Sequence, residues 1–122
     1  MLLDSNIVIY ATDSSHDKLL EWLDDKPLAA CSVTRIEVLG YHGLNPEEAD
    51  EIGNFLAGIT VYPLSDAIVD RSIALRRARK MPLPDAIIAA TALENDIPLV
   101  TRNTKDFRKI PNLELVNPFD DM

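Results

Sequence analysis

Short apolar runs alternate along this chain with longer segments whose apolar residues recur at helical spacing. Residues 28–32 form an uncharged run that is typical of a buried parallel strand. In residues 16–24, leucines recur at three- and four-residue intervals, which predicts a helix. The runs that predict strands lie at residues 2–3, 28–32, 58–63, 97–101 and 113–116. This alternation predicts an α/β domain with three α/β/α layers, in which helices cover both faces of a central, mostly parallel sheet.

Polar residues mark where the helices should begin. Asn45 is a candidate N-cap, because Pro46 fits the first helical position and two acids follow at the positive end of the helix dipole. Ser65 should cap the next helix, and Ser32 or Thr34 the helix after residues 28–32. A further apolar helix is expected over residues 85–93, after a proline-rich break. Two segments stay open: residues 7–10 are a strand continuation or a short helix, and residues 103–107 a turn or a short helix.

Composition limits the class of protein. With 122 residues, of which 47% are hydrophobic and 26% charged, the chain should fold as a single domain spanning residues 1–122. Its one cysteine, Cys31, cannot form an intrachain disulfide or a cysteine-rich zinc site, which indicates a reduced, cytoplasmic protein. The N-terminus lacks the basic residues of a signal peptide, and acids interrupt every apolar stretch. We therefore expect no membrane association.

The charge is unevenly distributed. The net charge of −8 argues against a general nucleic-acid binder, which needs lysine and arginine in excess. Residues 1–61 hold 11 acids and 3 bases, whereas residues 62–122 hold 9 of each. Any contact with a polyanion should therefore come from the second half.

Four acids fall where parallel strands end. Asp4 ends the first strand, Glu37 lies one turn into the helix after the second, Asp85 follows Pro84, and Asp106 follows the fourth strand. Ligands of open parallel sheets bind at this edge. Converging carboxylates need a cation or a proton, and oxygen ligands favour Mg²⁺ or Mn²⁺. Such a site hydrolyses phosphodiesters with a metal-activated water, which predicts nuclease chemistry.

Each acid also has a structural explanation. Asp4 could cap a helix over residues 5–10, Glu37 could be a solvated surface residue, Asp85 could be an N-cap or first-turn acid, and Asp106 could form a turn. The two histidines, His16 and His42, lie outside these segments.

Four segments of the chain match the motifs of a known family. They are Leu3-Asp4-Ser5-Asn6, Thr34-Arg35-Ile36-Glu37-Val38, the block from Leu83 to Ala92 and the block from Val100 to Phe107. Together they resemble the signatures of PIN-domain proteins, specifically the VapC toxins of type II toxin–antitoxin pairs. The resemblance spans nearly the whole chain.

The resemblance implies a divalent-metal-dependent endoribonuclease, with Mg²⁺ or Mn²⁺ as cofactor. Asp4, Glu37, Asp85 and Asp106 would occupy the catalytic and metal-binding positions. The remaining motif residues would support them: Asn6 by orienting Asp4, and Thr101 and Asn103 from the last block. Many relatives carry an acid where this chain has Asn103, and we choose Asp106 as the ligand because its carboxylate can carry the charge.

RNA binding by an acidic chain requires a local basic rim. The candidates are Arg76, Arg77, Arg79 and Lys80 before the Asp85 block, and Arg102, Lys105, Arg108 and Lys109 around Asp106. The alternative for the first cluster is a solvated helix face.

The resemblance also implies a cognate antitoxin and a homodimer. Ile52, Phe55, Leu56 and Ile59 could supply contact surface, and core packing is the rival use. Two other functions remain: a catalytically inactive PIN-like protein-binding module, against which the four acids argue, and a phosphatase or phosphorelay receiver. The last two fit poorly, since position 6 is Asn and only one acid ends the first strand.

Overall fold

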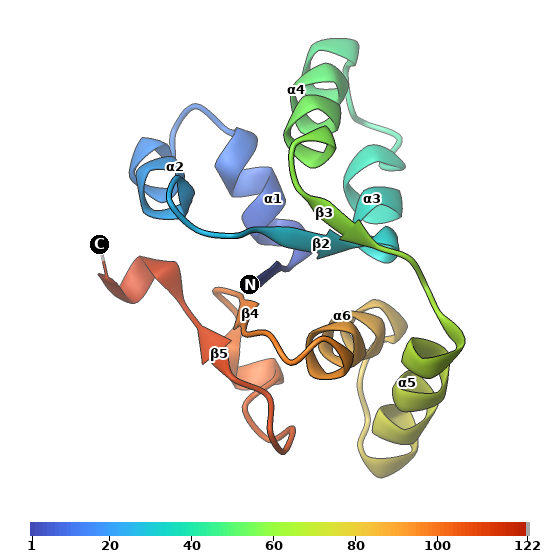
Figure 1. The fold of residues 1–122 in the computed structure, drawn as a ribbon. Helices are drawn as coiled ribbons and strands as arrows, with labels where there is room; N and C mark the ends of the chain where they lie inside the picture. The colour runs from blue at the N-terminus through green and yellow to red at the C-terminus, as the bar shows by residue number, and fades with distance from the viewer. Residues whose placement is uncertain (122) are drawn as a thin grey trace.

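A parallel sheet runs through the middle of the molecule in the computed structural model, which describes residues 1–121 (Figure 1). Its strands are β1 (Leu2–Leu3), β2 (Ala29–Cys31), β3 (Thr60–Tyr62), β4 (Leu99–Val100) and β5 (Leu115–Val116). Their order is β3-β2-β1-β4-β5, and every neighbouring pair is parallel. The chain first winds from β1 to β3 and then crosses to β4 and β5, so β1 lies at the centre.

Helices cover both faces of the sheet, which confirms the three-layer α/β/α prediction (Figure 1). On one side lie α1 (Ser5–Thr12), α2 (Asp17–Leu23), α3 (Ser32–Leu39) and α4 (Pro46–Ala57). On the other lie α5 (Asp66–Ala78) and α6 (Leu83–Glu94). Two short 3₁₀ helices, η1 (Thr104–Asp106) and η2 (Pro118–Asp121), complete the described chain. Successive strand residues point to opposite faces: Leu2 packs with the core on the α5–α6 side, and Leu3 with the core under α1–α4.

Two of the expected helix starts are confirmed. Asn45 Oδ1 accepts a hydrogen bond from the Glu48 N–H at 2.8 Å, and Glu48 Oε1 accepts one from the Asn45 N–H at 3.4 Å, which is a complete capping box. Ser65 Oγ accepts from the Ile68 N–H at 3.2 Å at the start of α5.

Two other starts differ from the prediction. Cys31, not Ser32 or Thr34, is the N-cap residue of α3. Ser32 is already helical, and its Oγ donates to the Tyr62 carbonyl on β3. Helix α6 begins two residues earlier than expected, because Pro82 has the extended cap conformation and Pro84 fits the first turn, which lacks N–H partners in any helix. Asp85 therefore lies in the first turn of α6 and is not its N-cap.

The two open segments are both helical. Residues 7–10 belong to α1, which buries Ile7 and Val8 and leaves Ile9 exposed. Residues 104–106 form the single turn of η1. One residue separates β1 from α1, and three residues separate β4 from η1, so both helices leave the edge of the sheet where the carboxyl ends of these strands meet.

The apolar residues of α4 and the following turn belong to the core. Ile52 and Leu56 are buried, and Phe55 and Ile59 pack partly buried against the same cluster. The contact surface suggested for them is therefore wrong, and core packing is the correct alternative. In residues 1–121, no helix has the length and apolar character needed to cross a membrane.

Candidate functional site

The four candidate acids come from elements that surround the carboxyl ends of β1 and β4. Asp4 directly follows β1, and Thr101 directly follows the neighbouring β4. The winding direction reverses between these two strands, and this is where open parallel sheets bind ligands. Glu37 reaches the same place from α3, Asp85 from the first turn of α6, and Asp106 from η1.

Asp4 is the buried acid of the group, with 7% of its surface exposed. Its Oδ1 accepts a hydrogen bond from the Ile7 N–H at 2.9 Å and so caps α1. Burial raises the pKa of Asp4, and the charge of Glu37 raises it further; hydrogen bonds from the Thr101 hydroxyl and the N–H groups of Ile7 and Asn6 lower it in part. The carboxylate is thus held in one orientation by donors that favour its charged form.

Asn6 contacts Asp4 through its backbone. Its N–H donates a hydrogen bond to the Asp4 carboxylate. The exposed Asn6 side chain lines the neighbouring cleft.

Glu37 is positioned by a residue that the sequence analysis did not single out. Ser5 Oγ donates to Glu37 Oε1 at 2.5 Å and lies 3.3 Å from Thr34 Oγ1. Thr34 is fully buried, and its hydroxyl also lies 3.6 Å from Cys31 Sγ. Ser5 and Thr34 lie inside the motif segments, but only the structure shows that they link α1 to α3 at the site.

Asp85 is the half-buried acid at the centre of the negative charge. Burial raises the pKa of its carboxyl, and the charges of Asp106, Glu37 and Asp4 raise it further. The three other acids therefore act on one carboxyl group. The structure brings all four predicted acids into one electrostatic cluster.

Asp106 is exposed and is held by its neighbour Asn103. Asn103 Nδ2 donates to Asp106 Oδ2 at 2.5 Å, and the Asn103 N–H donates to Thr101 Oγ1 at 3.0 Å. Thr101 is fully buried. The loop from β4 to η1 therefore connects Asp4 to Asp106 through Thr101 and Asn103.

The chemistry of this cluster fits a hard divalent cation. Its donors are carboxylate oxygens, which Mg²⁺ and Mn²⁺ prefer. A cation would also relieve the repulsion on Asp85. Within residues 1–121, no three Asp, Glu, His or Cys side chains converge closely enough to form a complete ligand set. The protein alone could thus offer one or two carboxylates at a time, which is the usual arrangement for Mg²⁺, because this ion keeps several waters.

A cleft of about 710 Å³ opens beside Glu37, between α1, α3 and α4. Its wall combines apolar and aromatic side chains, including the exposed Ile9 and Tyr41, with further acids. The acids of the cleft are Asp13, Glu37, Glu48 and Glu51. The cleft is therefore suited to a cationic group and disfavours a polyanion.

The predicted basic residues lie in different surroundings. Arg76, Arg77 and Lys80 line an apolar groove along α5. Arg79 is half-buried, and its Nη1 is buried without a hydrogen-bond partner among the described residues. The guanidinium of Arg102 lies 4.3 Å from the ring centroid of Phe119 and 5.7 Å from that of Tyr10.

The remaining basic residues and the two histidines lie near the surface loops and the aromatic side chains. Lys105, Arg108 and Lys109 are exposed on and just after η1, next to Asp106. His16 packs beside the Tyr10 ring, 4.9 Å between centroids, and His42 beside Tyr41.

Comparison with known proteins identifies the family of the chain. The ribonuclease VapC10 of Mycobacterium tuberculosis is 32% identical over 126 residues, covering 97% of this chain and 91% of that protein. A toxin–antitoxin complex from Klebsiella pneumoniae contains a chain that is 35% identical and superposes with a TM-score of 0.79, with 96% of each chain covered. In VapBC2 from Rickettsia felis, bound to a DNA fragment of its promoter, the corresponding values are 26% and 0.79, with 95% of this chain and 96% of that one covered. The model of the PIN domain matches residues 1–113, and the chain therefore belongs to the PIN-domain family.

Proposed function

We propose that this protein is a divalent-metal-dependent endoribonuclease and the toxin component of a toxin–antitoxin pair. One observation carries the proposal: the carboxyl of Asp85 lies in the field of three other acids, Asp106, Glu37 and Asp4, at the switch point of the sheet. The relatives named ribonuclease VapC and the toxin–antitoxin complexes of similar fold support it.

Carboxylates of the four-acid cluster, one or two at a time, would hold the metal, with Mg²⁺ or Mn²⁺ as the candidates. When bound, the ion supplies activation of the attacking water and neutralisation of charge on the scissile phosphate. The chain's own residues fix the carboxylates. Thr101 and the Ile7 N–H orient Asp4, Ser5 orients Glu37, and Asn103 orients Asp106.

RNA would approach from the side of η1. Lys105, Arg108 and Lys109 are exposed there, and lysine and arginine provide the phosphate contacts that an acidic chain otherwise lacks. Arg102 stacks on Phe119 and can add a contact at the edge of this surface. The cleft between α1, α3 and α4 is acidic, so it is a poor path for the RNA strand.

The cognate antitoxin would instead use this acidic cleft. Its four acids and its exposed Ile9 and Tyr41 suit a partner segment that combines basic and apolar side chains. Such a segment would block access to Glu37. We further propose a homodimer that works in the cytoplasm.

The alternative is an inactive PIN-like module that only binds protein. An inactive module would bind its partner protein without cleaving RNA, so the cleavage assay distinguishes the two hypotheses. The four retained acids and the donors that hold three of them favour the enzyme.

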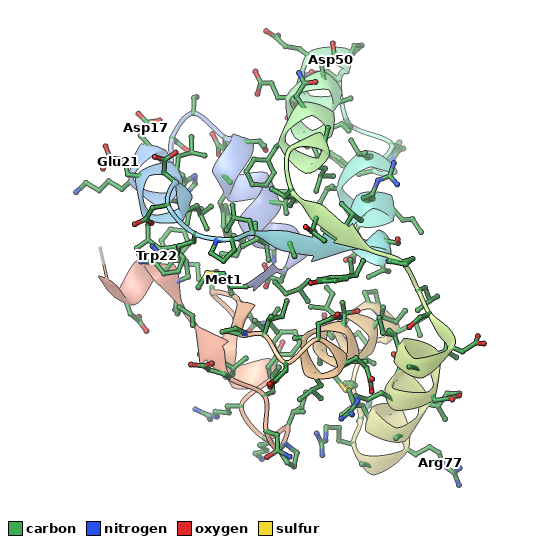
Figure 2. The ribbon with its side chains drawn as sticks, viewed as in Figure 1. Met1, Asp17, Glu21, Trp22, Asp50 and Arg77 are labelled. Carbon is green, nitrogen blue, oxygen red and sulfur yellow. The ribbon has the colours of Figure 1, made fainter. Side chains whose placement is uncertain are left out.

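The test is cleavage of single-stranded and looped RNA by purified protein, with Mg²⁺ or Mn²⁺ and with excess EDTA. We expect cleavage only with metal, and loss of cleavage in Asp85→Asn. Asp50→Asn is the matched control, since Asp50 is an exposed acid on α4 at the rim of the molecule (Figure 2). Undiminished cleavage in EDTA, with contaminating nuclease excluded, would refute the metal mechanism. Equal activity of Asp85→Asn and Asp50→Asn would refute the site.

A further inference from the structure

Three aromatic rings from separate parts of the chain meet near the end of β4. Tyr10 of α1, His16 at the start of α2 and Phe119 of η2 lie with their ring centroids 4.9, 5.7 and 5.9 Å apart. Phe119 meets both other rings edge-on, an arrangement that aromatic pairs favour. The guanidinium of Arg102 lies over the Phe119 ring, 4.3 Å from its centroid. We call these three rings and the guanidinium the aromatic platform.

The sheet determines where the aromatic platform lies. The Thr101 N–H donates to the Val116 carbonyl at 3.0 Å, so the segments that follow β4 and β5 leave the sheet side by side. Arg102 comes directly after Thr101, whose hydroxyl donates to Asp4. Phe119 follows shortly after β5. The aromatic platform therefore lies along the same edge of the sheet as the acid cluster, on the β4–β5 side of Asp4.

A hollow of about 340 Å³ opens at the aromatic platform, where η2 lies against α2 (Figure 1). Phe119 and His16 line it together with Ser15, Asp17 and Lys18. His16 Nδ1 lies 3.2 Å from Ser15 Oγ, which holds the imidazole in place. The hollow combines ring walls with a few hydrogen-bonding groups, which is the composition of a site for a small, flat, polar ring.

We propose that the aromatic platform binds an unpaired nucleobase of the RNA, close to the cleaved bond. The proposal rests on the ribonuclease activity proposed above. Proteins recognise single-stranded RNA by stacking its bases on phenylalanine or histidine rings and on guanidinium planes, and by hydrogen bonds to the base edges. Phe119, His16 and Arg102 supply the stacking surfaces. The side chains that can bond to the base edge are Ser15, Asp17 and Lys18.

The local charges favour a nucleotide over a peptide. Arg102 is exposed, and among the side chains that the structure describes no carboxylate pairs with its guanidinium. An acidic peptide would be repelled by Asp13 and Asp17, and a basic one by Arg102 and Lys18. A nucleotide instead offers an uncharged flat base to the hollow and a phosphate to Arg102. The basic residues on and after η1 extend this surface toward Asp106.

The first test is binding of short single-stranded oligoribonucleotides, measured by fluorescence anisotropy in chelator, which stops metal-dependent cleavage. Phe119→Leu should weaken binding about tenfold, the loss expected when one stacked base loses its ring. Arg102→Lys keeps the charge but removes the planar face, so it should also weaken binding. Circular dichroism and thermal unfolding check that every variant is folded.

Trp22→Leu is the matched control (Figure 2). Trp22, like Phe119, is a partly buried ring that packs against the core under α1–α4, and Lys26 Nζ lies 4.2 Å from its ring centroid. Trp22 does not line the hollow. The change from Trp22 to leucine should therefore leave RNA binding unaltered.

Oligoribonucleotides that lack a single base, at successive positions, separate recognition of the base from support of the fold. The unaltered chain should bind one of these abasic oligoribonucleotides about tenfold more weakly than the others. Phe119→Leu should bind that same oligoribonucleotide as well as the unaltered chain does, because the base that the ring would stack on is already missing. A purely structural role of Phe119 predicts the same loss on every oligoribonucleotide.

Three results would overturn the proposal. One is equal binding of all abasic oligoribonucleotides by the unaltered chain. Another is an equal effect of Phe119→Leu and Trp22→Leu. A third is unchanged RNA binding by Phe119→Leu together with loss of the co-expressed antitoxin, which would assign the aromatic platform to a protein partner. If the unaltered chain still cuts RNA with Mg²⁺, only the base site fails; if it neither binds nor cuts RNA, the proposed function fails as well.

Discussion

Replacing Thr101 by valine tests the link between the core and the acid cluster. Thr101 is fully buried, its hydroxyl donates to Asp4, and the same oxygen accepts the Asn103 N–H at 3.0 Å. Valine has nearly the same shape, so the change removes the hydroxyl and leaves the packing in place. It deprives the buried carboxylate of a donor and the Asn103 N–H of its acceptor.

The size of the effect follows from these two bonds. A hydrogen bond to a charged group contributes about 1.5–3 kcal/mol, and one between neutral groups about 1 kcal/mol. The free energy of unfolding at neutral pH should therefore fall by about 3 kcal/mol. For a chain of this length, that lowers the melting temperature by about 10 °C.

The loss should depend on pH with a definite sign. Burial holds the pKa of Asp4 above its ordinary value, so ionisation of Asp4 costs stability as the pH rises through that folded value. Thr101 reduces this cost by favouring the carboxylate, and Thr101→Val raises the pKa further. The difference between variant and unaltered chain should thus be largest at neutral pH. This difference should narrow toward about 1 kcal/mol as the pH falls below the folded-state pKa of Asp4 and its carboxyl is protonated.

The assay is thermal unfolding in chelator across this pH range. Thr91→Val is the matched control, because Thr91 is also fully buried, but its hydroxyl bonds only the Ile87 carbonyl within α6, at 2.7 Å. It should cost less than about 1 kcal/mol at every pH. If both variants lost the same stability at both ends of the range, the assigned role of Thr101 would be wrong.

Three other substitutions probe the acid cluster. Asp85→Asn should raise the melting temperature in chelator at neutral pH, because the folded-state pKa of Asp85 is raised and ionisation of this group therefore costs stability. The gain should vanish as the pH falls below that folded-state pKa, and a lower melting temperature at neutral pH would contradict the prediction. Ser5→Ala should lower RNA cleavage about tenfold or more while costing only about 1 kcal/mol of stability, since it frees Glu37; unchanged cleavage would remove Ser5 from the site. Asn103→Asp sets a second carboxylate against Asp106, so it should destabilise the fold in EDTA. Added Mg²⁺ should then raise the melting temperature of this variant more than that of the unaltered chain, and an equal rise would count against a metal at Asp106.

The fold was accessible from the sequence because its signals are local. The pair Asn45-Pro46, an N-cap followed by proline, is enough to predict where α4 begins, and the uncharged run at residues 28–32 contains β2. The start of α6 was misplaced, since Pro84 was taken as a break, whereas proline is tolerated in the first turn of a helix. Residues 7–10 stayed ambiguous because an apolar tetrapeptide fits either state, and the cap supplied by Asp4 decides it.

The site was only partly accessible. The order of the strands brings the ends of β1 and β4 together, so the grouping of Asp4 and Asp106 follows from topology. The hydrogen-bond donors that hold the acids do not follow from the strand order. Ser5 reaches Glu37 across 32 positions of sequence, and this pairing depends on how α1 packs against α3. The exposure of Val69 and Ile73 on α5 was equally hidden, because apolar residues at helical spacing are expected to be buried.

Asp4 shows that capping and chemistry need not be alternatives. Its Oδ1 caps α1 through the Ile7 N–H, a role that asparagine could also fill. The same bond, together with those from Thr101 and the Asn6 N–H, fixes the direction of the carboxylate while burial raises its pKa. The cap therefore also gives the carboxylate the fixed direction that a metal ligand needs. Asparagine would keep the cap and lose the charge, so Asp4→Asn separates the two roles: it should preserve the fold in chelator and abolish cleavage. Loss of the fold would show that the charge itself stabilises α1.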